Sequence, residues 1–524
     1  MALGFAARQR DAGFALGLIA VSLIGITPYL FLYLRAGQQP VINEADPSTW
    51  QALFDVIRRA QYGIRTPLDD PTFRHEDPAN PGRGLRIVVL QIANYLQYFD
   101  WQWGNGLGAP LRTLATLGFG YLGLRGLGAQ WKADRSGAWL LLVLFLVTGL
   151  GLVAYMNFKP GYSIGYHWFP DPDQHEVRER DYFFVVSFIV WGVWAGIGLA
   201  SLARRLSSRA ARNAVLLVAA VPFALNFRVA DRRWGPEARL PGDFAANLLN
   251  SVPPYGILFT FGDNDTFPLW WAQEVAGVRR DVTVICLALA ETDWYMRQLR
   301  NAPVRPFEPR KAPAIWRDAP APGPPDWPLH TMTDAEIAAA VPQILSREVR
   351  MPVGSYQVTL PERTVLYGKD FLALRVIRQN FGRRPIVWAL TAAGEYYGLD
   401  RFVEQRGLGI HLSAQPVDTG AARYDLRRLM GVPLDVPATE RLMEETYRYG
   451  ELLERGARGL ESTASGIAST LGLPFTQLAL AAEARGDTAK LVRYLDRAVR
   501  LAPNPAILAK LESMRPGPPP HLPP

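Results

Sequence analysis

The amino-acid sequence predicts a mixed fold in three parts: an α-helical transmembrane region of about five spans, an extracytoplasmic α/β domain, and a C-terminal helical segment that resembles a tetratricopeptide repeat. Three observations predict it. Long uncharged apolar runs occur only in about the first 230 residues. A strand–helix–strand pattern follows at 256–288, which is typical of a parallel sheet. From about residue 439 the pattern is helical.

Composition excludes several classes of protein. The chain has 524 residues, of which 49% are hydrophobic and 20% charged, and its clustered apolar runs exclude a purely cytosolic enzyme. The single cysteine, Cys286, excludes a disulfide framework and a multi-cysteine metal site. The formal charge of +8 comes from arginines that concentrate beside apolar segments. We therefore expect the lipid bilayer, and no nucleic acid, as a partner.

Five apolar segments are predicted to span the membrane. A helix rises about 1.5 Å per residue, so about 20 apolar residues cross roughly 30 Å of hydrocarbon. Three segments have this length, at 14–34, 137–156 and 182–203. Two shorter segments, at 113–124 and 213–227, lie between arginines and can cross if those side chains reach the interfaces.

The placement of basic residues predicts the orientation. With five spans, the segments 1–13, 125–136 and 203–212 share one side and carry nine basic residues, against only Asp11 and Asp134. Basic residues favour the cytoplasmic side. We therefore expect a multi-pass protein of the cytoplasmic (inner) membrane with a cytoplasmic N-terminus. The first apolar run is too long for a cleavable signal peptide and precedes no small-residue cleavage site.

The transmembrane region is thus predicted at 1–228, with extracytoplasmic loops at 35–106 and 158–181. The end of the first loop, at 87–103, mixes apolar residues with five aromatic ones. An interfacial helix with an aromatic belt is one interpretation of this stretch. An aromatic surface that contacts a sugar or a lipid is the other.

The extracytoplasmic α/β domain is predicted at 229–425. It begins with a strand at 256–261, a helix at 266–275 and a strand at 282–288. A second set has a helix at 370–380, a strand at 385–390, a helix at 397–405 and a strand at 409–412. Between the sets, 302–329 contains nine prolines, which indicates an irregular linker.

The helical, tetratricopeptide-like segment is predicted at 435–515. Residues 478–503 fit one helix pair of such a repeat. A lone pair has no stacked neighbour to complete its core, so we expect it to pack on a helix at 440–458. The proline-rich tail at 516–524 is expected to be disordered.

A candidate ligand-binding site lies where the first strand ends. Asp263, Asn264 and Asp265 follow this strand directly, at the edge where α/β sheets place their sites. Two carboxylates and an amide suit a divalent cation, a sugar hydroxyl or a phosphate-bound metal. The simpler interpretation is a turn that caps the following helix, since Asp and Asn accept hydrogen bonds from the first helical amides.

A second candidate site lies at the outer end of the fourth predicted span. Arg178 and Arg180 are candidates for binding a lipid-linked phosphate, because guanidinium groups bind phosphate oxygens bidentately. The alternative is a salt-bridged helix start in which Glu179 and Asp181 neutralise the arginines. The preceding loop, 167–175, holds two histidines and two aspartates, which permit a metal site, although a solvated polar loop explains them more simply.

Several strings of the sequence resemble a known family. They are YLR at 33–35, NEADPSTW at 43–50, RAQYG at 59–63, RERDY at 178–182, GDNDTFPLW at 262–270, TDWY at 292–295, RPI at 384–386 and YGLD at 397–400. Together they resemble a bacterial family of multi-spanning membrane proteins of unassigned function. That family is related to eukaryotic transmembrane O-mannosyltransferases, which look like GT-C glycosyltransferases. The resemblance covers about residues 20–510, and the string at 262–270 is quite specific.

The resemblance implies transfer of a sugar from a polyprenyl-phosphate donor to a protein or glycan acceptor, with no metal or other cofactor assigned. Family members usually carry an acidic first outer loop and a His-Pro-Pro-Gly element. In GT-C enzymes this early loop supplies the carboxylate that activates the acceptor hydroxyl. Neither string occurs here. The chain therefore resembles the C-terminal half of the family pattern, and its catalytic residues are unknown. A split gene, a misplaced start codon and a noncatalytic relative are the three alternatives, and the first of them implies a partner protein that supplies the N-terminal half.

Two other functions compete with this one. The first is a noncatalytic, membrane-anchored scaffold whose periplasmic α/β and helical modules bind a protein or a glycan. The second is a free-standing hydrolase built on Asp263 and Asp265, which ranks last because the sequence offers no nucleophile beside them.

Overall fold

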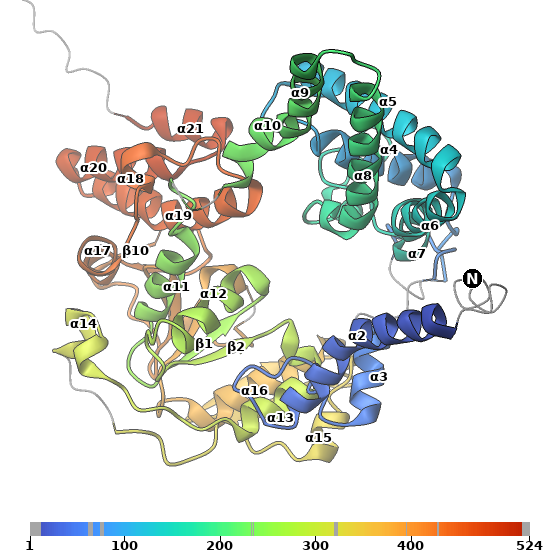
Figure 1. Cartoon of the computed structure of the whole chain (residues 1–524). Helices are drawn as coiled ribbons and strands as arrows, with labels where there is room; N and C mark the ends of the chain where they lie inside the picture. The colour runs from blue at the N-terminus through green and yellow to red at the C-terminus, as the bar shows by residue number, and fades with distance from the viewer. Residues whose placement is uncertain are drawn as a thin grey trace, which may run out of the picture. The chain divides into compact units, whose positions relative to one another are not determined.

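The structure is a computed structural model that describes residues 12–60, 66–73, 78–231, 233, 235–318, 323–394, 396–426 and 429–515 (Figure 1). Two compact units make up the chain. Residues 1–61 and 234–524 form the first unit, and residues 62–233 form the second. The tail at 516–524, which we expect to be disordered, lies outside the described residues.

Four helical segments of the described chain are long and apolar enough to cross a membrane, which indicates a multi-pass membrane protein. The first lies within α2 (Ala12–Ala36), and the second combines α6 (Arg135–Leu146), a π-helical turn and α7 (Leu152–Met156). The third contains α8 (Val185–Ala203), and the fourth contains α9 (Arg209–Leu217) and α10 (Val221–Ala230). They coincide with four of the five predicted spans.

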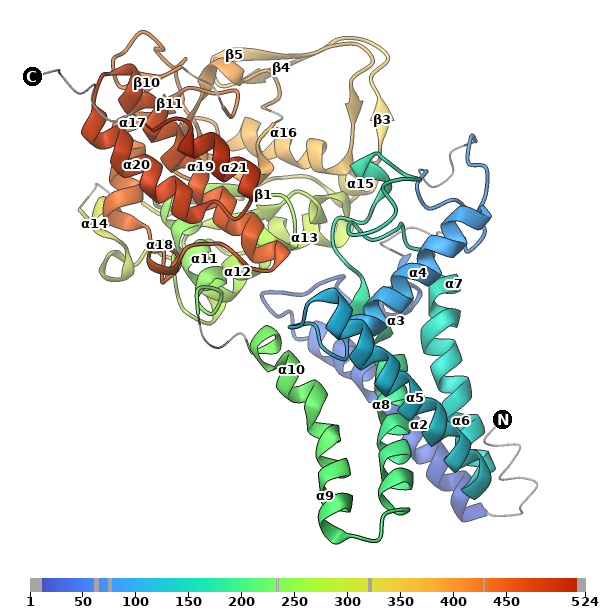
Figure 2. The same cartoon turned by 90° about the horizontal axis from the view of Figure 1, so that it is seen from above.

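The remaining predicted span, 113–124, lies inside a longer helix, α5 (Ala109–Ala133). This helix is less apolar than the other four because it carries Arg112, Arg125 and Lys132. It packs directly on α8, and the two helices lie side by side in Figure 2. The five-span topology therefore stays a prediction.

The aromatic stretch at 87–103 forms most of α4 (Leu85–Trp101). Tyr95 and Tyr98 of this helix are buried and pack on Phe184 and Phe188. These two tyrosines therefore contribute to the core of the second unit rather than to a surface that faces a ligand.

The first unit is built on a mixed seven-stranded sheet with the order β10-β11-β8-β9-β7-β1-β2. β1 (Ile257–Thr260) pairs in parallel with both β2 (Thr283–Cys286) and β7 (Ile386–Ala389). β9 (Gly409–Leu412) is antiparallel to β7 and to β8 (Val403–Arg406). β11 (Leu434–Asp435) is parallel to β8, and β10 (Tyr424–Asp425) closes this edge. The predicted strand–helix–strand unit is confirmed, with α12 (Asp263–Glu274) between β1 and β2.

The predicted helix at 397–405 is wrong. The structure has a short 3-10 turn, Asp400–Phe402, followed by strand β8. Tyr397 and Gly398 both have positive φ angles, 53° and 78°, which a right-handed helix does not allow. Gly407, with a φ of 56°, then turns the chain back into β9, so β8 and β9 form a hairpin and the sheet is mixed.

Shorter elements complete the first unit. The proline-rich segment at 302–329 is irregular as predicted, apart from a 3-10 turn (Pro309–Lys311) and the four-residue α14 (Ala314–Arg317). The other elements are α3 (Trp50–Arg58), α11 (Leu240–Asn250), α13 (Asp293–Asn301), α15 (Asp334–Ala338), α16 (Gly368–Asn380), β3 (Gln343–Ile344), β4 (Val349–Val353), β5 (Tyr356–Leu360) and β6 (Val365–Leu366).

The C-terminal helices include the expected pair, α19 (Ser462–Ala484) and α20 (Thr488–Leu501), which lie side by side in Figure 1 and are followed by α21 (Pro505–Glu512). The predicted single helix at 440–458 is wrong. This stretch contains the end of α17 (Val436–Arg441), a π-helical turn and α18 (Leu452–Arg455). The first helical run ends where Tyr447 takes an extended conformation, and Gly450 and Gly456, on either side of α18, have positive φ angles. The pair does pack here, since Lys490 and Tyr494 both contact Glu440. Its likeness to a tetratricopeptide repeat stays a prediction.

One hydrophobic core joins the sheet and these helices. Phe259 and Trp388 of the sheet belong to the same buried cluster as Phe475 and Tyr494 of the helix pair. A buried hydrogen bond of 2.7 Å between the Gln405 and Gln477 amides also links β8 to α19. The helix pair therefore supports the sheet directly.

Candidate functional site

The turn between β1 and α12 holds the predicted ligand-binding residues, and Asp265 is buried within it, with 4% of its surface exposed. Its carboxylate accepts hydrogen bonds from the backbone N–H groups of Gly262 (2.9 Å) and Phe261 (3.0 Å). The Thr391 hydroxyl, just after β7, donates to the same carboxylate. Asp265 thus caps α12 and links the ends of two neighbouring strands, which is a structural role.

Asp263 and Asn264 lie in the first turn of α12 and are exposed. The structure places Glu44, from the loop after α2, near Asp263. Crowding by surrounding protein atoms and the Asp263 carboxylate raise the pKa of Glu44, although its side chain remains exposed to solvent. Of the three predicted residues, Asp265 is therefore a buried helix cap, whereas Asp263 and Asn264 are exposed. Glu44 lies near the exposed pair. The sequence signal for this neighbour is that NEAD at 43–46 and GDND at 262–265 both belong to the family resemblance.

Charged groups also follow β2 at the same edge of the sheet. Glu291 lies in the 3-10 turn after this strand, and Lys369 lies in the first turn of α16. Burial raises the pKa of Glu291, and the nearby Lys369 ammonium opposes this shift. Within the described chain, no group of three or more His, Cys, Asp or Glu side chains is arranged to hold a metal ion.

The arginine site at the start of the third candidate span, Asp181–Ala203, is partly occupied by the protein itself. Glu176 accepts two hydrogen bonds from Arg180, at 2.9 and 2.6 Å, and Arg180 also donates to the Tyr182 hydroxyl. Glu179 instead accepts from Tyr98 and from the backbone of Ser163. Arg178 is exposed. The expected local ion pair therefore exists at Arg180, where its acid is Glu176.

The histidine-containing loop at 167–175 places His175 in the interior, where it stacks on Tyr166. Its two ring nitrogens face the backbone carbonyls of Gly161 (3.0 Å) and Phe169 (2.7 Å). Both nitrogens are therefore engaged by the backbone, which leaves neither of them facing a metal ion.

Sequence reasoning missed a groove of about 1110 Å³ in the first unit. The loop after α2, α12, the start of β2, α13 and the proline-rich segment all contribute to its walls. Its side chains include three tryptophans and five arginines, namely Trp270, Trp294, Trp327, Arg280, Arg297, Arg300, Arg305 and Arg384. The elements that form its walls are far apart in the sequence, so no local pattern predicts the groove. The nine prolines at 302–329 were the one local sign of an unusual segment.

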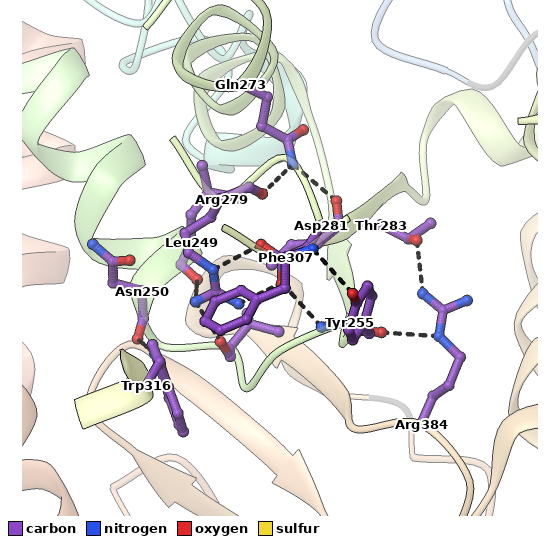
Figure 3. Close-up of polar contacts among 12 residues, drawn as sticks. Leu249, Asn250, Tyr255, Gln273, Arg279, Asp281, Thr283, Phe307, Trp316 and Arg384 are labelled. Carbon is purple, nitrogen blue, oxygen red and sulfur yellow. Dashed lines mark hydrogen bonds and ion pairs between the residues drawn. The ribbon is translucent and has the colours of Figure 1, made fainter. Parts of the chain in front are cut away.

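A buried polar network holds the strands beside this groove (Figure 3). Arg279 and Asp281 form a bidentate ion pair, with N–O distances of 2.9 and 2.8 Å, and Asp281 also accepts from the backbone N–H of Tyr255. Arg279 donates further to the carbonyls of Leu249 and Val252. These contacts connect the end of α11 to the starts of β1 and β2.

The fold and these sites define a multi-pass membrane protein that carries a mixed α/β domain. Residues 241–306 match the family model described as TMEM260-associated domain 2. This segment covers α11, β1, α12, β2 and α13, and it relates the chain to a glycosyltransferase-like membrane family. The match fits the predicted relation to O-mannosyltransferase-like proteins. No curated protein and no solved structure matches the chain.

Proposed function

We propose that the chain is part of a GT-C-like membrane glycosyltransferase that moves a sugar from a polyprenyl-phosphate donor to a protein or glycan acceptor. The match of 241–306 to the TMEM260-associated domain supports this proposal, together with the four apolar helices. A partner protein with the N-terminal half of the family pattern supplies the carboxylate that activates the acceptor hydroxyl.

Within this proposal, the membrane helices hold the polyprenyl chain and the exposed Arg178 contacts the donor phosphate. Arg178 is three residues before the apolar segment Asp181–Ala203, which puts a guanidinium near the depth of lipid phosphates. Arg180 contributes only if phosphate displaces Glu176, because its guanidinium is already paired.

Transfer is measured in membranes from cells with and without the gene for this chain, supplied with a polyprenyl-phosphate donor that carries a radiolabelled hexose. We expect the label to reach protein or glycan only when the chain is present. The double change Arg178→Ala with Arg180→Ala should lower transfer, whereas Arg204→Ala with Arg205→Ala, at the other end of the same helix, should not. Undiminished transfer in cells without the gene would refute the proposal.

A noncatalytic scaffold is the second candidate, and the helices α19, α20 and α21 favour it because stacked helices are common protein-binding surfaces. In this case sugar transfer is independent of the gene. A protein partner should then co-purify with the full chain and be lost when exposed residues of α20 or α21 are changed.

A further inference from the structure

Three buried polar atoms without hydrogen-bond partners belong to residues that line the same groove. They are Trp294 Nε1, Gln298 Oε1 and Arg384 Nη1. Folded proteins rarely leave buried polar atoms unpaired. Such an atom has lost its hydrogen bond to water and gained none in the protein, which costs free energy. Eight such atoms occur among the described residues, and three of the eight belong to this one groove, which points to a polar ligand that completes their contacts.

Arg384 is the most informative of the three. Only 4% of its surface is exposed, and it donates to the Tyr255 carbonyl (2.9 Å) and the Thr283 hydroxyl (2.8 Å). Figure 3 shows its third nitrogen pointing away from both partners. Among the described residues, no carboxylate lies within ion-pair distance of this guanidinium. Burial without an acid lowers the pKa of Arg384 to about 10, so the side chain stays charged at neutral pH.

The other arginines of the groove already have acidic partners. Arg280 and Arg305 both pair with Glu274, at 3.3 and 2.6 Å. Arg300 pairs with Asp334 at 2.9 Å, and Arg297 pairs with Asp293 at the same distance. Among the five arginines of the groove, Arg384 is therefore the one without an acidic partner in the described chain, and an anion from a ligand would fit there.

The remaining lining residues suit a carbohydrate. Trp270, Trp294 and Trp327 give the groove aromatic surface, on which the apolar face of a sugar ring can pack. Sugar hydroxyls both donate and accept, so they match the unpaired Trp294 N–H and the unpaired Gln298 carbonyl. A volume of about 1110 Å³ accommodates several sugar units.

We propose that the groove binds an acidic oligosaccharide, whose carboxylate or phosphate pairs with Arg384 and whose hydroxyls contact Trp294 and Gln298. Only binding is inferred, so the proposal goes beyond the proposed function and stands whether or not the chain takes part in sugar transfer.

The test is calorimetric titration of the full-length protein in lipid nanodiscs with three probes of similar size: tetragalacturonate, a phosphorylated maltotetraose and neutral maltotetraose. We expect at least one acidic probe to bind at least about tenfold more tightly than the neutral one. The probe that binds identifies carboxylate or phosphate as the anion. No binding, or equal affinity for acidic and neutral probes, would overturn the proposal.

Variants locate the binding site. Arg384→Met should remove the preference for acidic probes, and Trp294→Phe, which deletes one N–H and keeps an aromatic ring, should weaken all binding several-fold. Because Arg384 also holds Tyr255 and Thr283, Gln298→Met serves as a third variant on the more accessible helix α13. Trp271→Phe and Arg350→Met change exposed residues outside the groove and serve as controls. Unchanged affinity in Trp294→Phe and Gln298→Met would contradict the assignment.

Discussion

Individual buried polar residues of the first unit fall into two groups. Asp265, Arg279 and Asp281 have partners for their charged atoms, and each of them joins segments of the sheet. Arg384 joins the same segments but keeps one nitrogen unpaired. The contacts of the first group hold these segments in register, whereas the unpaired nitrogen of Arg384 is the observation from which the oligosaccharide site is proposed, because a buried charge without a partner costs free energy.

The capping role of Asp265 is testable against its exposed neighbour. Asp265→Ala should lower the free energy of unfolding by about 1–3 kcal/mol, because the N–H groups of Phe261 and Gly262 lose their acceptor. Asp263→Ala, at an exposed position of the same turn, should change it by less than about 0.5 kcal/mol. Proteolysis of the detergent-solubilised protein across a urea gradient measures both values. Equal effects would mean that Asp265 does not hold this turn.

Stability should depend on pH through His411. This side chain is buried in β9, and burial, with Arg406 nearby, holds its pKa well below the ordinary 6.5. Above pH 6.5 the folded and unfolded states are both neutral at this position. Below 6.5 the unfolded state gains a proton that the folded state does not bind, so stability falls by up to about 1.4 kcal/mol per pH unit.

The check on His411 is the unfolding midpoint in urea between pH 5 and pH 7.5. In His411→Leu, the free energy of unfolding should fall less steeply below pH 6.5, because one fewer proton is taken up on unfolding. His330, whose pKa burial also lowers, titrates in both proteins and therefore cancels in the comparison. A decline that is equally steep in both proteins would contradict the prediction.

At the scale of elements, the contact between α5 and α8 depends on glycine. A Cβ atom on Gly126 of α5 would lie 1.7 Å from the Trp194 carbonyl oxygen, and one on Gly198 of α8 would lie 2.1 Å from the Leu122 carbonyl oxygen. The two backbones therefore touch, as they do where membrane helices associate through small residues. The close approach of these two backbones is therefore the feature of α5 that a substitution can test.

Gly126→Val should separate these helices, because the nearest atoms are backbone atoms that a side-chain rotation cannot move. We expect a loss of roughly 1–3 kcal/mol or more, seen as a lower melting temperature of the detergent-solubilised protein. Gly128→Val, on the same helix, meets no atom within 4 Å and is the matched control. Similar melting temperatures for the two variants would refute the close crossing.

For the molecule as a whole, features that depend on neighbouring residues could be predicted from the sequence, whereas features that depend on contacts between distant residues could not. Apolar length located four membrane-spanning candidates, and β1, α12 and β2 followed from alternating strand and helix signals. The helix at 397–405 failed because its second half pairs with β9 as strand β8, and because the positive φ angle of Tyr397 has no sign in the local pattern. The groove was missed because its walls come from segments that lie up to 345 residues apart, from Gln39 to Arg384, which no local pattern reveals.

The number of spans is decided by whether α5 crosses the membrane. Its 25 residues extend about 37 Å, which is enough to cross, and its glycine contacts with α8 favour a fifth span. With five spans and a cytoplasmic N-terminus, reporters fused after residues 130, 170, 208 and 240 should lie inside, outside, inside and outside. With four spans the order is reversed at every position, whereas a fusion after residue 48 lies outside in both cases and is the control. An outside signal at 130 together with a cytoplasmic signal at 240 would show that α5 does not cross and would put the α/β domain on the cytoplasmic side.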